Sequence, residues 1–206
     1  MTRFYAFAKT LCAGWFKIAG IRVIGAENIP AQQPIIVIAN HLSFGDPPAL
    51  VLTFPYQLTF VAKEEFSHHA FTRILFGALG AVFLKKEESD LTAMRTVINT
   101  LKAGHSAAVF PEGRRTFKEG MTEFKPGAAY LAARTGVVVV PVALINTADF
   151  LKFWKRNVMI NIGMPIFPDQ TKLPLSEQVP LLTQRFTEAV TSLHSEIAAI
   201  LEKEGK

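Results

Sequence analysis

The chain has 206 residues, of which 50% are hydrophobic, and its formal net charge at pH 7 is +5. A chain of this length forms one hydrophobic core more readily than two, and it contains no run of 18 apolar residues that would span a membrane. Its single cysteine, Cys12, excludes an intrachain disulfide.

The positive charge favours an anionic partner. Nucleic acid is a weak candidate, because the sequence has no DNA- or RNA-binding signature and no dense run of lysine and arginine. Lipid headgroups or phosphorylated substrates fit better with the mean hydropathy of +0.25. We therefore expect a globular domain with an apolar, basic face on a bilayer, and the alternative is a large core or a dimer interface.

The N-terminal segment, residues 1–22, has the pattern of an amphipathic helix. Its large apolar residues recur at intervals of three and four, on one helical face: Phe4, Phe7, Leu11 and Trp15. All charged residues before Glu27 are basic. This combination is typical of a helix that lies in a membrane interface, and packing against the protein core is the equally open alternative.

Six apolar runs rich in β-branched residues follow, at residues 35–39, 58–62, 81–84, 107–110, 137–144 and 158–162. Helical patterns separate most of them: Asp46 and Asp90 stand at expected helix N-caps, and Gly104 and Gly136 at expected helix ends. From Ser176 onward one long amphipathic stripe predicts a helix that packs on the sheet or on a partner. This alternation predicts an α/β fold with a mostly parallel central sheet flanked by helices. Because no repeat or linker is present, we expect residues 23–206 to form a single domain.

Polar side chains follow four of these apolar runs. In open parallel sheets, ligands bind beyond the carboxyl ends of the strands. If the four strands are parallel, one edge of the sheet collects His41, Asp46, Lys63, Lys86, Glu112 and Arg115. The two lysines are point charges that would reach a phosphate bound at this edge, although exposed surface positions at strand ends are the commoner case.

His41 and Asp46 form the first candidate pair. A neutral imidazole can take a proton from a hydroxyl as that oxygen attacks a thioester carbonyl, and a carboxylate on the other ring nitrogen fixes the tautomer. Residues five positions apart do not face each other on a regular helix, so we expect a loop at His41 that turns into a helix at Asp46. The alternative is that Asp46 only caps the helix and His41 is incidental.

The second motif, residues 110–116, combines a carboxylate, a glycine and two guanidinium groups. Arg115 offers the bidentate fork that suits phosphate, whereas Arg114 either assists it or is a solvated surface charge. Glu112 would accept hydrogen bonds from acceptor hydroxyls or restrain Arg115. Gly113 would permit a positive φ and the close approach of a ligand.

Other chemistry is poorly supported. The sequence has no Gly-x-Ser-x-Gly elbow, and Cys12 lies in the N-terminal segment, so covalent catalysis is not expected. His68 and His69 are adjacent and lack the spacing of metal ligands. No glycine-rich nucleotide loop is present, and we expect neither a metal nor a bound cofactor.

At these motifs the chain resembles the 1-acyl-sn-glycerol-3-phosphate acyltransferase family, the PlsC-type lysophospholipid acyltransferases. Asn40, His41 and Asp46 match the family's Asn-His-x4-Asp block. Residues 110–113 and Arg115 match its Phe-Pro-Glu-Gly-Thr-Arg-Ser block. Residues 80–86 look like its Gly-x-x-Phe-x-x-Arg block, and residues 140–142 look like its Val-Pro-Val block. All four occur in the family's order, within residues 25–165.

The resemblance implies transfer of an acyl group from acyl-CoA or acyl-carrier protein to the free hydroxyl of lysophosphatidic acid, which gives phosphatidic acid. It implies His41 and Asp46 as the catalytic dyad, phosphate binding by Arg115 and Lys86, and Lys63 as the family's lysine after the first block. The acyl donor is then a co-substrate, and no cofactor is needed. The protein would be peripheral or monotopic on the cytoplasmic face of a membrane.

The chain departs from the family pattern at three positions. Lys86 stands where the family usually has arginine, Arg114 where it has threonine, and Thr116 where it has serine. These differences leave the acceptor open, so another lysolipid or an amino-acid-derived lipid is an alternative. A non-catalytic lipid-binding adaptor is a second alternative. Residues 152–156 are a possible second basic-aromatic contact with the bilayer, and an exposed loop is equally compatible.

Overall fold

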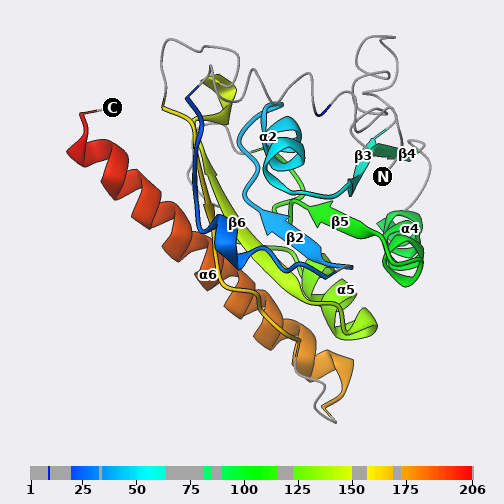
Figure 1. Ribbon diagram of the computed structural model, residues 1–206. Coiled ribbons are helices and arrows are strands. Elements are labelled where there is room, and N and C mark those ends of the chain that lie inside the picture. The colour runs from blue at the N-terminus through cyan, green and yellow to red at the C-terminus, as the bar shows by residue number, and fades with distance from the viewer. Residues whose placement is uncertain are drawn as a thin grey trace.

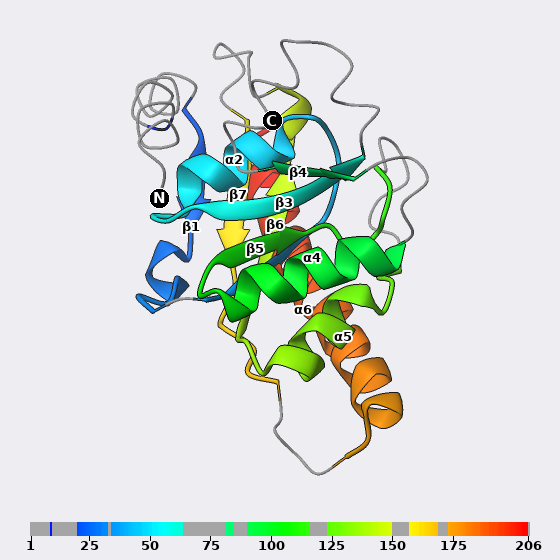
Figure 2. The ribbon, with the colours of Figure 1, turned by 90° about the vertical axis from the view of Figure 1, so that its right-hand side faces the viewer.

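The computed structural model describes residues 20–32, 34–63, 81–84, 90–115, 123–149, 157–168 and 173–205, together with Lys9 (Figures 1 and 2). The predicted N-terminal helix therefore lies almost wholly outside the described residues, as do Lys86, Thr116, the His68–His69 pair and residues 152–156. Within the described part, no helix is both long enough and apolar enough to cross a bilayer.

A single sheet organises the described part of the chain. Its seven strands lie in the order β1-β7-β6-β2-β5-β3-β4. Their bounds are β1 Arg22–Ile24, β2 Ile36–Ala39, β3 Leu58–Lys63, β4 Ala81–Leu84, β5 Ser106–Val109, β6 Val139–Ile145 and β7 Met159–Ile162. All neighbours pair in parallel except β6 and β7, which are antiparallel. The prediction of a mostly parallel α/β fold in one domain is confirmed.

The helices cover both faces of this sheet. They are α2 Asp46–Thr53, α4 Asp90–Lys102, α5 Gly127–Thr135 and α6 Leu175–Lys203, with short 3-10 turns η1 at Ala26–Asn28 and η3 at Thr147–Asp149. Alternate residues of β2 point to opposite faces, as a strand requires. Ile35, Val37 and Ala39 pack with α2, whereas Ile36 and Ile38 pack with α4, α5 and α6. Figure 2 shows α2 on one side of the strands and α4 and α5 on the other.

The C-terminal helix α6 confirms the amphipathic stripe. Its buried residues recur at helical spacing and belong to the core cluster shared with α4 and α5: Leu182, Phe186, Val190, Ile197 and Leu201. The helix contacts β6, β7 and α5, and Figure 1 shows it running diagonally across the sheet. Of the two predicted partners for this stripe, the sheet is the observed one.

Glycine ends the helices as predicted. Gly136 is the C-cap of α5 at φ 69°, and its N–H donates to the carbonyl oxygen of Ala132 at 2.8 Å. Gly104, at φ 80°, follows α4. The prediction for Asp46 is wrong by one residue: the N-cap of α2 is Gly45, and Asp46 is the first helical residue. Because Pro47 and Pro48 have no N–H to donate, a carboxylate at this end of the helix is available for other donors.

Candidate active site

The carboxyl ends of β2, β3, β4 and β5 lie at one edge of the sheet, because these four strands are parallel. This edge holds the ends of both sequence motifs. The imidazole of His41, just after β2, stacks on the ring of Phe110, just after β5, with centroids 4.1 Å apart and planes inclined by 16°. Two motifs that are about seventy residues apart in the sequence are thus in direct contact, as the positional argument predicted.

Asn40 fixes the point where the chain leaves β2. Its side chain is fully buried and donates from Nδ2 to the carbonyl oxygen of Leu144 at 2.9 Å. The N–H of Leu144 donates back to Asn40 Oδ1 at 2.7 Å. The amide therefore continues the pairing of β2 with β6 by one more residue. His41 leaves the sheet from an anchored position as a result.

His41 and Asp46 lie within hydrogen-bond distance, with Nδ1 2.7 Å from Asp46 Oδ2. The same oxygen accepts from the backbone N–H groups of Leu42 at 2.7 Å and Ser43 at 2.8 Å. Asp46 is fully buried, whereas 20% of the His41 side chain is exposed. The expected loop that turns into a helix at Asp46 is therefore present, and it brings the pair together.

This set of donors determines which ring nitrogen of His41 carries the hydrogen. An ionised carboxylate only accepts hydrogen bonds, so Nδ1 donates to Asp46. In a neutral imidazole, Nε2 is then the acceptor. The arrangement leaves Nε2 able to take a proton from a hydroxyl, which is what a general base requires.

Glu112 links the second motif to the first. Its carboxylate is 3% exposed, and Oε1 accepts from the backbone N–H of His41 at 2.9 Å. This bond was not anticipated from the sequence, which predicted contacts with substrate or with Arg115. It joins the loop after β5 to the loop after β2 beside the imidazole.

Gly113 has the positive φ that the sequence predicted, at 68°. The close approach at this residue is made by the protein itself. A Cβ on Gly113 would lie 2.8 Å from Nζ and 3.1 Å from Cε of Lys125, whose stem crosses the loop. The backbone N–H of Lys125 also donates to the carbonyl oxygen of Pro111 at 3.0 Å. Lys125 thus brings a further cation to this loop, and no spacing in the sequence pointed to it.

Arg115 reaches back to the first motif. Its guanidinium carbon lies 3.8 Å from the ring centroid of Phe44, a side chain that is 54% exposed in the loop between His41 and Asp46. Arg115 therefore lies beside the loop that joins His41 to Asp46. Arg114 is exposed. Lys63 is the last residue of β3, which places its backbone at the same edge of the sheet.

Thr147 is a site residue that the sequence reasoning missed. It follows β6, is 1% exposed, and its hydroxyl donates to Asp46 Oδ1. The same hydroxyl accepts from Ser43 Oγ at 3.0 Å. His41 was found by the rule that ligands bind beyond the carboxyl ends of parallel strands. The same rule would have pointed to Thr147, because β6 is parallel to β2 and its carboxyl end lies at the same edge.

His194 on α6 is half-buried. Burial lowers its pKa, and the negative charge of Glu112 raises the pKa in opposition. The helix on the far face of the sheet is therefore within electrostatic reach of the site. Among the described residues, no three His, Cys, Asp or Glu side chains gather as metal ligands would.

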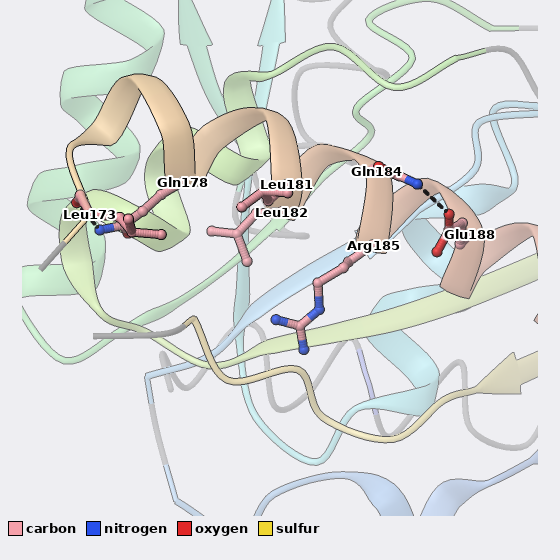
Figure 3. Close-up of a pocket in the computed structure, with 7 residues that line it drawn as sticks. All are labelled: Leu173, Gln178, Leu181, Leu182, Gln184, Arg185 and Glu188. Carbon is pink, nitrogen blue, oxygen red and sulfur yellow. Dashed lines mark hydrogen bonds between the residues drawn. The ribbon is translucent and has the colours of Figure 1, made fainter. Parts of the chain in front are cut away.

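A hollow of about 270 Å³ lies elsewhere, along the first half of α6 (Figure 3). Its lining residues are Leu173, Gln178, Leu181, Leu182, Gln184, Arg185 and Glu188. None of them belongs to the loops that carry His41, Asp46 or Arg115. The chemistry of the described residues therefore points to the sheet edge and not to this hollow.

Fold and site together define the class of protein. The sequence model of the acyltransferase family matches residues 20–145, more than half of the chain and the part that holds His41, Asp46 and Arg115. The chain belongs to the acyltransferase family.

Individual relatives sharpen the comparison. The 1-acyl-sn-glycerol-3-phosphate acyltransferase of Borreliella burgdorferi is 30% identical over 154 residues, which are 73% of this chain and 60% of that protein. The match thus spans about three fifths of that relative's length. The protein of the same name from Bacillus subtilis is 25% identical over 194 residues, covering 90% of this chain and 96% of the relative.

A solved structure supports the same family. The crystal structure of the 1-acyl-sn-glycerophosphate (LPA) acyltransferase PlsC from Thermotoga maritima is similar to this fold, with a TM-score of 0.71 and 26% sequence identity. The similarity covers 95% of this chain and 80% of that chain. The family resemblance inferred from the four motifs is confirmed.

Proposed function

We propose that this protein transfers a fatty acyl group from acyl-CoA or acyl-carrier protein to the free hydroxyl of lysophosphatidic acid, giving phosphatidic acid. The observation that carries the proposal is the His41 Nδ1 to Asp46 Oδ2 contact of 2.7 Å, which leaves Nε2 as the acceptor. The printed names of the Borreliella burgdorferi and Bacillus subtilis relatives support the choice of acceptor.

In the proposed reaction, His41 Nε2 takes the proton of the acceptor hydroxyl as that oxygen attacks the thioester carbonyl. Asp46 stabilises the imidazolium that forms. The tetrahedral intermediate then collapses, the bond from carbon to sulfur breaks, and the imidazolium returns its proton to the departing thiolate. The products are the new ester and a free thiol, so atoms and charge balance.

Cations hold the acceptor phosphate in this proposal. Arg115 lies against Phe44, next to the loop that carries His41, and its guanidinium offers two parallel donors to phosphate oxygens. Lys63, Lys86 and Arg114 are the additional candidates. The backbone of Lys63 lies at the same edge of the sheet as His41. Positioning of the phosphate would place the free hydroxyl near Nε2, which lowers the entropic part of the barrier.

The lipid substrate implies a membrane. We propose that the protein is peripheral or monotopic on a cytoplasmic membrane face, held by the amphipathic residues 1–22. The acyl donor acts as a co-substrate, and the proposed chemistry requires neither a cofactor nor a metal.

The test is thiol release by the purified protein from acyl-CoA in the presence of lysophosphatidic acid. His41→Ala should abolish turnover and leave the fold intact, because the imidazole is the only base in the proposed step. His105→Ala is the matched control, since His105 is exposed in the turn before β5. Circular dichroism and thermal unfolding check the fold of both variants.

Two results would overturn the proposal in different ways. Substantial turnover by His41→Ala would remove His41 from the mechanism. Failure of the wild type with acyl-CoA and acyl-carrier protein donors, across a panel of lysolipid and amino-acid lipid acceptors, would favour the non-catalytic lipid-binding adaptor. Turnover with another acceptor only would keep the reaction class and change the substrate.

A further inference from the structure

The two carboxylate oxygens of Asp46 have partners from different parts of the chain. Oδ2 accepts from His41, Leu42 and Ser43, all within five residues of Asp46. Oδ1 accepts from the hydroxyl of Thr147, which is 101 residues away in the sequence. Of the two oxygens, it is Oδ1 that ties the helix α2 to the end of β6.

The hydrogens of this network have one consistent direction. Because the ionised carboxylate has no proton, the hydroxyl of Thr147 must donate to it. Thr147 then accepts from the hydroxyl of Ser43 at 3.0 Å, and Ser43 Oγ accepts from the N–H of Gly45 at 3.0 Å. Thr147 and Ser43 are 1% and 5% exposed, so water does not compete freely for these bonds.

A specific backbone conformation delivers Thr147 to this position. The preceding residue, Asn146, has φ 57°, the only positive φ among the described residues other than glycine. Its side chain donates to the carbonyl oxygen of Asn157 at 3.1 Å, and its carbonyl accepts from the N–H of Asp149 at 2.8 Å. The left-handed residue turns the chain at the end of β6, and the short turn η3 then contacts α2. Such conformations persist where the surrounding structure fixes them, and they cluster at functional sites.

We infer that Thr147 is a positioning residue, whose hydroxyl sets the rotation of the Asp46 carboxylate and through it the orientation of the His41 imidazole. The inference rests on the proposed function. Its physical basis is that the last torsion of an aspartate side chain is broad, so the hydrogen bonds to its two oxygens decide the orientation that the carboxylate takes. The buried hydroxyl of Thr147 on Oδ1 restrains this torsion further and adds a charge-assisted hydrogen bond.

The first measurement compares Thr147→Val, which keeps the shape and loses the hydroxyl, with Thr147→Ser, which keeps the hydroxyl. We expect Thr147→Val to lower kcat by about 10- to 100-fold, the usual range for a hydrogen bond to a charged group, while the acceptor KM stays within about twofold. Thr147→Ser should retain most of the activity. Thr53→Val is the matched control, because Thr53 lies on the same helix as Asp46 but its hydroxyl donates to the carbonyl oxygen of Ala49 within that helix.

A double-mutant cycle separates positioning from structural support. If Thr147 acts through Asp46, then Thr147→Val in an Asp46→Asn background should lower kcat by less than about threefold further. If the decrease in kcat of the double variant equals the product of the two single decreases, Thr147 acts independently of Asp46, and the inference is overturned. Should Thr147→Val fail to fold, Ser43→Ala tests the same chain of bonds, and an unchanged kcat in that variant would also overturn it.

A readout without turnover distinguishes this inference from the proposed function. The ¹⁵N chemical shifts of the His41 ring report which nitrogen carries the hydrogen. We expect the Nδ1–H form in the wild type and a mixture of both tautomers in Thr147→Val. Identical spectra in the two proteins would contradict the positioning role even if the enzyme is active, whereas altered spectra in an inactive protein would leave the positioning role standing and remove the proposed reaction.

Discussion

The two halves of the site differ in how firmly the fold holds them. In the dyad half, residues 40–46 with Thr147, the Asp46 carboxylate is fully buried and accepts four hydrogen bonds. In the clamp half, residues 110–115, Gly113 and Arg114 are exposed, and the guanidinium of Arg115 lies on the exposed ring of Phe44. The groups proposed to move a proton are thus held by buried hydrogen bonds, whereas the loop around Arg115 contains solvent-exposed residues. Preorganisation matters most where charge develops during reaction.

The largest expected effect comes from breaking the dyad half at Asp46. Asp46→Asn keeps the shape but presents an amide to donors, so the His41 tautomer is no longer fixed. We expect kcat to fall by about 100- to 10,000-fold, the scale seen when the triad aspartate of a serine protease is neutralised. The acceptor KM should change little, and steady-state kinetics measure both. A kcat within about tenfold of wild type would show that the dyad half is not the catalytic half.

Arg115→Ala should give the opposite kinetic pattern. Loss of a bidentate contact with phosphate is expected to raise the acceptor KM by about 10- to 100-fold, with a smaller effect on kcat. The matched control is Arg134→Ala, an exposed arginine at the end of α5. An effect of Arg115→Ala confined to kcat would contradict the division into two halves.

Phe44 should have a smaller effect, because it acts on Arg115 and not on substrate. An exposed cation–π contact is worth about 0.5–1 kcal/mol, so Phe44→Ala should raise the acceptor KM about two- to fivefold. Phe44→Tyr keeps the ring and should resemble the wild type. In an Arg115→Ala background the effect of Phe44→Ala should vanish, and a persistent effect would show a separate role for the ring.

The smallest expected effect is on stability and links α6 to the site. Burial lowers the pKa of His194 from 6.5, the value in the unfolded chain, with opposition from the charge of Glu112. As pH falls through 6.5, the unfolded state binds the proton first, so the folded protein loses stability between that pH and the lower folded-state pKa. Thermal unfolding at about pH 8 and about pH 5.5 should show a greater loss for wild type than for His194→Gln. His105→Gln is the control, and parallel pH dependence of wild type and His194→Gln would contradict the expectation.

Much of the fold was predictable because its signals are local. The β-branched runs predicted six of the seven described strands, and glycine predicted the end of α5. The strand β1 was missed because three residues, Arg22–Ile24, are too few to show a periodic pattern. The Asp46 cap was misplaced by one residue because its carboxylate accepts from the preceding N–H groups of Leu42 and Ser43 and does not cap the helix.

The residues of the candidate site show the same difference between local signals and tertiary contacts. His41, Asp46 and Arg115 were found because each follows a recognisable strand and carries distinctive chemistry. Thr147 and Lys125 were missed because their roles depend on tertiary contacts: one donates to a residue 101 positions away, and the other crosses Gly113 with its side chain. The position of Thr147 after a parallel strand could have marked it as a residue of this edge, but neither its bond to Asp46 nor the path of Lys125 has a signal in a single sequence.

The one antiparallel pair in the sheet has a consequence for how the chain enters the molecule. β7 runs opposite to β6, and β1 runs with β7, so β1 begins at the edge where β2 and β5 end. The polypeptide therefore arrives at Arg22 from the side of His41. An anchor placed before Arg22 would draw that side toward its own attachment point, so a lipid leaving the bilayer would meet the imidazole without travelling around the sheet. Under the proposed function, the reversal between β6 and β7 would put membrane attachment and substrate entry on the same side of the sheet.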